Sequence, residues 1–330
     1  MLRTHILAKI NFFRQKQTKS WYICTCMTRL IDDISTFLNS NGFSCSHLMQ
    51  NGIEVISVNL QNGHIKTILP LEVSALTQEE ARSQAEETDN CIRLILSCGG
   101  EYPLIITEDR WNSQRQCTEA RLLAHIEVFN PIYARNCEVK RIDKAEAKAF
   151  LEANHSYGYA ACKYCYGLFL KRHTGHIAHE ISAYNGSGEE WRLPGTLVAV
   201  ATFSNARKWI KEDMEIRSYE WTRYASLPDV RLSGGMGRLL KAFIKEVQPD
   251  DIMSYADLEW SIGNVYDQLG FELEGQKAPV AFEVEMGTWK RSPIKSPGEN
   301  TTQHDVPVKN LRFFQNFGSN KYRLKLTDYK

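Results

Sequence analysis

A short glycine-rich turn in the C-terminal half of the chain is the feature best suited to hold a ligand. The residues after it, 238–247, place their apolar side chains on one face of a predicted helix. Backbone N–H groups at a helix start have no partner within the helix, so they can cradle a phosphate. The turn is predicted to bind a nucleotide-bearing cofactor, although such turns often serve the fold alone. It consists of Ser233, Gly234, Gly235, Met236 and Gly237.

Three polar side chains flank this turn in the sequence. Asp257 ends a predicted strand, 252–257, and Arg223 lies on the preceding predicted strand, 219–224. If the strands are parallel neighbours, both side chains reach the same crevice at the strand ends. Tyr266 follows on a short predicted helix and is suited to move a proton. The alternatives are a buried Arg–Asp brace and an ordinary packed tyrosine.

A histidine and a pair of cysteines are further candidates. His155 lies in an Asn-His-x-x-Gly loop, where it is expected to contact substrate, to act as a base or merely to cap a helix. Cys162 and Cys165, with histidines further along the chain, are residue types that could bind zinc. The spacing does not match a zinc finger, so we expect no metal site here. Those histidines are His173, His176 and His179.

The elements before residue 130 alternate in a recognisable order. Periodicity and Asn-Gly turns predict helix, three strands, helix, strand and helix. This αβββαβ order is similar to that of restriction-type nucleases of the PD-(D/E)xK kind. The third strand region, 65–73, has no E-x-K motif. An active nuclease of this kind needs clustered carboxylates to bind its metal. We therefore expect 27–130 to be a noncatalytic module; the remaining carboxylates are Glu54, Glu72, Glu108 and Asp109.

The bulk properties of the chain narrow its class. Its 330 residues allow about two domains, and the net charge of +1 gives no global attraction to nucleic acid. No apolar run is long enough for a transmembrane helix. Nine cysteines without a secretory signal favour the reducing cytoplasm. Residues 1–26 are basic and are expected to be a loosely attached extension, with Met27 as an alternative start.

Several short motifs lie around the turn within residues 134–275. They are Asn154-His155-x-x-Gly158, Tyr166-Gly167-Leu168, 199–203, Tyr219-Glu220-x-x-Arg223, Ser233-Gly234-Gly235-x-Gly237-x-Leu239, Tyr255-Ala256-Asp257, Trp260-Ser261-x-Gly263-x-x-Tyr266 and Leu269-Gly270-Phe271. Together they resemble the Mom family of phage DNA-modification proteins and related proteins of phages and mobile elements. These proteins have the N-acetyltransferase-like (GNAT) fold, whose cofactor turn reads R/Q-x-x-G-x-G/A. Here Arg231 leads the turn but Met236 takes the last position, so neither register fits fully.

The resemblance implies an acetyl-CoA-dependent enzyme that modifies adenine N6 in DNA. It implies that the glycine turn holds the pyrophosphate, that Arg223 and Asp257 orient substrate or stabilise charge, that Tyr266 handles a proton and that His155 lines the acceptor side. A flipped or single-stranded base and phosphate contacts would be needed. The cations available near the fold are Arg207, Lys208, Lys211, Arg217, Lys290, Arg291 and Lys295.

We therefore expect an α/β (α+β) protein in which a smaller nuclease-like αβββαβ module precedes a GNAT-like mixed-sheet domain. The second domain spans 134–330 and is expected to be irregular over 276–330. Two other functions stay open. One is a noncatalytic DNA-binding accessory of a phage or mobile element, and the other is a GNAT acetyltransferase acting on a protein or small-molecule amine.

Overall fold

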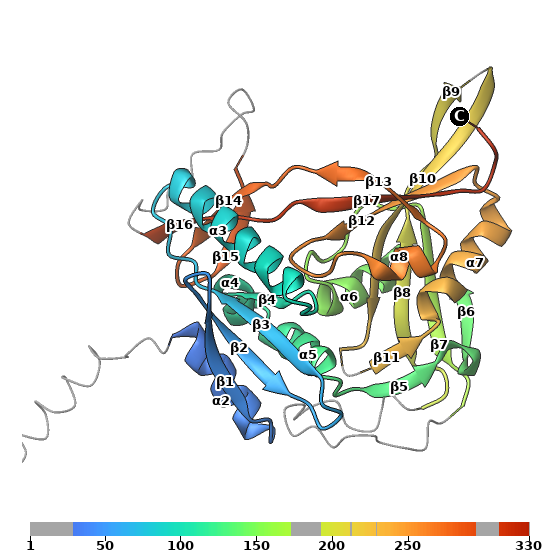
Figure 1. The fold of residues 1–330 in the computed structure, drawn as a ribbon. Helices are drawn as coiled ribbons and strands as arrows, with labels where there is room; N and C mark the ends of the chain where they lie inside the picture. The colour runs from blue at the N-terminus through green and yellow to red at the C-terminus, as the bar shows by residue number, and fades with distance from the viewer. Residues whose placement is uncertain (1–28, 173–192, 212, 229, 295–309, 330) are drawn as a thin grey trace, which may run out of the picture.

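The computed structural model describes residues 29–172, 193–211, 213–228, 230–294 and 310–329. They form a mixed α/β protein with four sheets. Figure 1 places the N-terminal elements on one side and the largest sheet on the other, with the C-terminal strands running between them. No helix in these ranges is long and apolar enough to cross a membrane.

The N-terminal module follows the predicted element order. It runs through α2 (Leu30–Ser40), β1 (Cys45–Gln50), β2 (Ile53–Asn59), β3 (Ile65–Leu71), α3 (Gln78–Ser97), β4 (Leu104–Thr107), α4 (Glu108–Ser113) and α5 (Arg115–His125). The sheet order is β1-β2-β3-β4, and only the β3–β4 pair is parallel. The β1–β2 hairpin turns at Asn51 and Gly52, both with positive φ, as the Asn-Gly signal predicts. The short helix α4 was not predicted, and α5 is the last of the predicted helices of this module.

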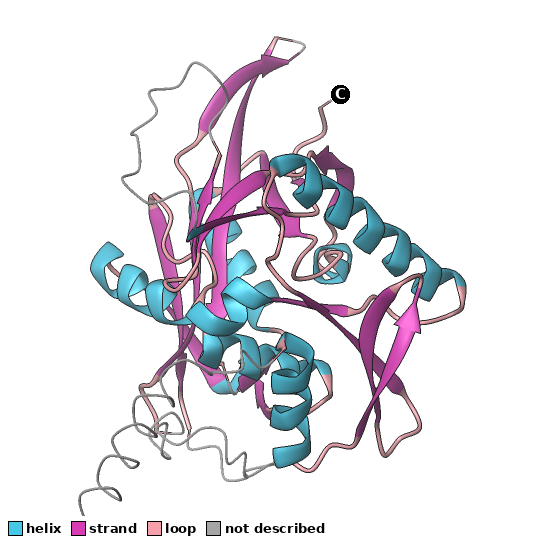
Figure 2. Ribbon diagram, turned by 90° about the vertical axis from the view of Figure 1, so that its left-hand side faces the viewer, coloured by secondary structure: helices cyan, strands magenta, loops and turns pink. Residues whose placement is uncertain are grey.

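The largest sheet carries the C-terminal half of the chain. Its order is β13-β17-β12-β10-β8-β7-β6, and β9 pairs with β10. In a view turned by 90°, the β9–β10 hairpin extends beyond the body of the molecule (Figure 2). The strands are β6 (Cys137–Arg141), β7 (Tyr164–Leu170), β8 (Leu197–Phe203), β9 (Arg207–Lys211), β10 (Met214–Ser226), β12 (Asp251–Asp257), β13 (Glu272–Lys277) and β17 (Ser319–Lys325).

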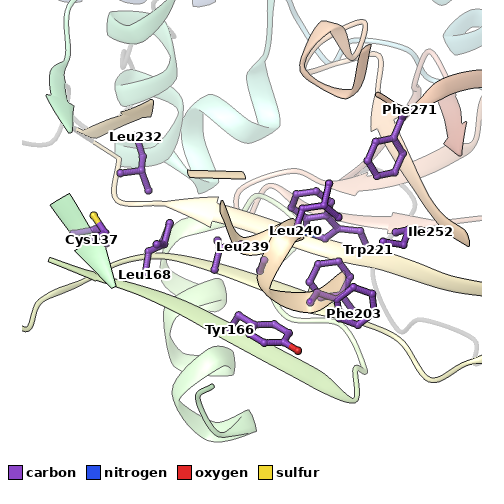
Figure 3. Close-up of a cluster of buried hydrophobic side chains, with 14 of the residues drawn as sticks. Cys137, Tyr166, Leu168, Phe203, Trp221, Leu232, Leu239, Leu240, Ile252 and Phe271 are labelled. Atoms are coloured by element: carbon purple, nitrogen blue, oxygen red, sulfur yellow. The ribbon is translucent and has the colours of Figure 1, made fainter. Parts of the chain in front are cut away.

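Two helices cover opposite faces of this sheet. Phe203 of β8 stacks on Phe243 of α7 (Gly235–Val247), with ring centroids 3.9 Å apart. Both side chains belong to the main core, in which Figure 3 shows Phe203 near Trp221 and Tyr166. Val200, on the other face of β8, packs with Leu151 of α6 (Lys144–Asn154). Because neighbouring side chains of a strand point to opposite faces, the apolar residues of β8 pack against both α6 and α7.

Two small strands support the glycine turn. β5 (Asn130–Tyr133) and β11 (Val230–Ser233) pair in parallel, and β11 leads directly into α7. After β5 the chain forms a 3₁₀ turn, Ala134–Asn136, and continues directly as β6. The turn at the start of α7 is therefore fixed to the segment that joins the two halves of the chain.

The C-terminal segment is more regular than its Ser-Pro-rich sequence indicates. Within 276–330 lie β14 (Ala281–Glu285), β15 (Lys290–Pro293) and β16 (Leu311–Gln315), which form a sheet of order β15-β14-β16. Phe282, Val284 and Phe314 of this sheet pack with Val73 of the N-terminal module. The expectation of an irregular segment is thus wrong for the described part, and β17 lies close to the predicted last strand.

Candidate functional site

The two central parallel strands separate part-way along their length. β10 and β12 pair from Ser218–Asp251 to Glu220–Met253. Beyond that point the Ser254 hydroxyl donates to the Trp221 carbonyl, over 3.1 Å, and β10 bulges between Trp221 and Arg223 against β8. A cavity of about 500 Å³ lies beyond this point, between the two strands. Its lining includes all four side chains singled out as catalytic: Arg223, Asp257, Tyr266 and His155.

Asp257 ends β12 and is the most closely surrounded of these four. Its Oδ2 accepts a 2.6 Å hydrogen bond from the Tyr157 hydroxyl, and Oδ1 accepts one from the Glu259 backbone N–H. Arg110 Nη2 lies 3.9 Å from Oδ2. Burial, and next the nearby Glu259 charge, raise the pKa of Asp257 above its ordinary value. A carboxylate with a raised pKa is a better proton acceptor at neutral pH.

Arg223 does not pair with Asp257, although the strands are parallel neighbours as expected. Its Nε donates to the Gly158 carbonyl, 3.1 Å away, and Nη1 donates to the Thr222 carbonyl. Burial lowers its pKa. Among the described residues it makes no ion pair with that carboxylate, so neither the brace nor a direct Arg–Asp couple is present. Arg223 instead fixes the 155–158 loop at the cavity wall.

Tyr266 and His155 also line this cavity. The Tyr266 hydroxyl lies 2.8 Å from Ser254 Oγ, and burial raises its pKa. The phenol therefore keeps its proton at neutral pH and can donate it. His155 Nδ1 accepts a hydrogen bond from the Tyr157 backbone N–H, and burial, followed by the charge of Arg223, lowers its pKa to about 4. The ring is neutral with its proton on Nε2, so it can donate a hydrogen bond but is not a free base at Nδ1.

The glycine turn borders a second cavity, of about 970 Å³. Gly234 has φ +76°, a conformation that favours glycine, and α7 starts at the next residue. Gly234, Gly235 and Gly237 line the cavity, whereas Ser233 is exposed and lies outside this lining. Of the turn residues predicted to hold the cofactor, the structure therefore brings the three glycines to this cavity and leaves Ser233 outside it.

The two cavities adjoin. Residues that line both are Cys117, Asn154, Tyr224, Met236, Trp260 and Val265. A molecule held at the glycine turn can therefore extend from the larger cavity toward Asp257. Met236, the residue that departs from the glycine pattern, lies at this junction.

The N-terminal module supplies part of these walls, which the sequence did not indicate. The Arg121 guanidinium lies 3.8 Å from the centroid of the Trp260 ring and donates to the carbonyls of Glu259 and Trp260. Burial lowers the pKa of Arg121 to about 9. Tyr157 was also missed. It lies two residues from His155 in the same loop, and this proximity is its one sequence signal.

The cysteine pair does not lie in this site. Cys162 Sγ and Cys165 Sγ are buried and 3.4 Å apart, and the Tyr159 hydroxyl is 3.4 Å from Cys162 Sγ. In the described part of the chain no three His, Cys, Asp or Glu side chains are grouped to hold a metal ion. His173, His176 and His179 lie outside the described residues.

The acidic and basic residues considered above are mostly engaged in pairs. Glu108 accepts a hydrogen bond from the Val73 N–H, and Asp109 pairs with Arg291. Because the Arg291 side chain is only 9 % exposed, it is not available to a DNA phosphate, contrary to our expectation. Arg217 pairs with Asp250, and Lys295 lies outside the described residues.

No model of a known protein family matches this chain, and no curated protein matches it.

Proposed function

We propose that the protein is an acyl-CoA-dependent transferase with a GNAT-like core, and that it modifies an amino group of a DNA base. One observation carries the proposal: the cavity between the diverging strands β10 and β12 adjoins the cavity at the glycine turn of α7. A transferase needs such a pair of connected sites, one for the activated donor and one for the acceptor.

The residues at the larger cavity fit an acyl-CoA. The 13-residue helix α7 begins at the turn, and three glycines leave its first backbone N–H groups without covering side chains. Such N–H groups favour a pyrophosphate. When bound, the cofactor would supply an activated thioester. Met236 would then contact the chain that passes between the cavities.

The residues at the smaller cavity fit the transfer to an amine. Asp257, with its raised pKa, takes the proton that the attacking amine must lose. Tyr266 keeps its proton and is suited to donate it to a leaving thiolate. Neutral His155 and Arg223 shape the acceptor side.

A nucleobase is the acceptor that we favour. The resemblance to Mom-like proteins suggests it, and a cavity of about 500 Å³ has room for an extruded base. Tyr157 and Trp260 offer aromatic faces in its wall. Phosphate contacts would come from exposed cations such as Arg207 and Lys290, since Arg291 is buried.

The test is to incubate the purified full chain with acetyl-CoA and either double- or single-stranded DNA, and to analyse the nucleosides by mass spectrometry. We expect a modified nucleoside that depends on acetyl-CoA and disappears with Asp257→Asn. Calorimetry with acetyl-CoA comes first. If acetyl-CoA does not bind, the protein is better explained as a noncatalytic accessory. If acetyl-CoA binds and DNA stays unmodified, while a peptide or a small-molecule amine is acylated, the acceptor is a protein or small-molecule amine instead of a DNA base.

A further inference from the structure

A buried chain of charges connects the candidate site to two distant parts of the protein. Arg110 Nε on α4 donates to Glu259 Oε1 over 3.2 Å. Glu259 Oε2 accepts from Arg291 Nη1 of β15 over 2.7 Å. Arg291 also makes two hydrogen bonds, of 2.7 and 2.8 Å, to the carboxylate of Asp109. The side chains of these four residues are at most 9 % exposed.

These four charges cancel, and Arg110 reaches beyond them toward the cavity. Its guanidinium lies 4.7 Å from the centroid of the Tyr157 ring, and its Nη2 lies 3.9 Å from Asp257 Oδ2. Arg110 thus contacts both members of the Tyr157–Asp257 hydrogen bond. Glu259 is oriented by two arginines, so it holds Arg110 in place rather than leaving it free to turn away.

We propose that Arg110, which the N-terminal module contributes, is a positioning residue for the pocket: it holds Tyr157 against Asp257 and supplies the nearest positive charge to that carboxylate. The catalytic consequence rests on the proposed function, but the placement of the charge does not. The N-terminal module therefore contributes to the active site without any nuclease chemistry of its own.

The other charged and titratable groups near Asp257 do not replace Arg110. Arg121 of α5 is half-buried, but its hydrogen bonds go to backbone carbonyls and it stacks on Trp260. Arg223 of β10 is directed to Gly158. The groups that face this carboxylate from all packed elements are Arg110, Arg121, Tyr102, Tyr157 and Glu259. In the described part of the chain, Arg110 is the one cation of this group that lies within salt-bridge range of Asp257.

The experiment is a pH titration of the Asp257 carboxyl carbon by ¹³C NMR, in the full chain labelled at aspartate. The signal is identified by its loss in Asp257→Asn. Removing a nearby cation disfavours the carboxylate, so Arg110→Met is expected to shift the titration midpoint of Asp257 to higher pH. The matched control is Arg115→Met, because Arg115 belongs to the same module but pairs with Asp33 and Glu119. It is expected to leave the midpoint unchanged.

Thermal unfolding checks that each variant folds. If Arg110→Met does not unfold cooperatively, Arg110→Gln replaces it, since glutamine still donates a hydrogen bond to Glu259. An unchanged Asp257 midpoint in a folded Arg110 variant overturns the proposal, and so does an equal shift in Arg115→Met. If the wild type transfers no acyl group but the midpoint shifts, the proposed function fails and the role of Arg110 stands. If transfer occurs and the midpoint does not shift, only the role of Arg110 fails.

Discussion

The Tyr157 hydroxyl donates a 2.6 Å hydrogen bond to Asp257 Oδ2, across 100 residues of sequence. It joins the loop after α6 to the end of β12, at the point where β10 and β12 have separated. The loop is held from its other side by Arg223, which donates to the Gly158 carbonyl. The loop and the strand end therefore form one wall, and the carboxylate has a fixed direction into the cavity.

Replacement of Asp257 by asparagine tests the proposed base directly. Asparagine keeps the shape and accepts the Tyr157 hydrogen bond, but it takes no proton. We expect kcat/KM for acyl transfer to fall by about 10²-fold or more, with the melting temperature nearly unchanged. Asp267→Asn, on the exposed side of the short helix α8 (Asn264–Gln268), is the control and should retain activity. Full activity in Asp257→Asn would remove this residue from the mechanism.

Tyr157→Phe separates the role of the hydrogen bond from that of the ring. The phenol's hydrogen bond favours the Asp257 carboxylate, so its loss raises the pKa of Asp257 and moves the acid limb of the pH–rate profile to higher pH. A hydrogen bond to a charged group contributes about 1.5–3 kcal/mol, so kcat/KM below that limb should fall about tenfold or more. Tyr133→Phe, an exposed tyrosine outside both cavities, is the control. Identical profiles for Tyr157→Phe and wild type would contradict this role.

Two half-buried histidines should make the fold sensitive to acid. Burial lowers the pKa of both His125 and His155 to about 4, compared with 6.5 in the unfolded chain. Between these values the unfolded state binds more protons, so the free energy of unfolding decreases as pH falls from 6.5 to 4. The slope is at most about 1.4 kcal/mol per pH unit for each histidine. Between pH 4 and 6.5 the melting temperature should change less with pH in His125→Gln and His155→Gln than in the control His64→Gln, whose side chain is exposed. Equal slopes would show that neither histidine stays neutral in the fold.

The glycines of the turn differ in what a methyl group would meet. A Cβ on Gly235 would come within 2.6 Å of Leu232 Cδ2, whereas one on Gly237 would lie 3.2 Å from the end of Leu269. We expect Gly235→Ala to destabilise the protein by about 1–3 kcal/mol and to reduce the thermal stabilisation by acetyl-CoA. Gly237→Ala should lose less stability, because alanine favours a helix interior. If acetyl-CoA stabilises both variants as it does the wild type, the turn is not the cofactor site.

The sequence predicted the elements whose periodicity is local. The apolar face of α7, the alternation in β12 and the Asn-Gly turn after β1 each follow from neighbouring residues, and Asp257 was found because it ends a strand. Tyr157 and Arg110 were missed because their contacts with Asp257 depend on tertiary packing across 100 residues or more of sequence. The strands β14 to β16 were missed for the same reason, since their apolar residues pack on Val73 of the distant N-terminal module.

The contribution of the N-terminal module to the site predicts that residues 134–330 do not function alone. Without the module, Phe282, Val284 and Phe314 lose the surface that they pack on around Val73, and Arg291 loses Asp109. The Arg291–Glu259 pair remains, but each hydrogen bond that it loses to Asp109 or Arg110 costs about 1.5–3 kcal/mol, and together these losses are a large part of a typical domain's stability. We expect the fragment to lack a cooperative thermal transition and to bind no acetyl-CoA, and coexpression with residues 27–133 should restore both. A fragment that unfolds cooperatively and binds acetyl-CoA as the full chain does would show that the C-terminal half is an independent domain with a complete cofactor site.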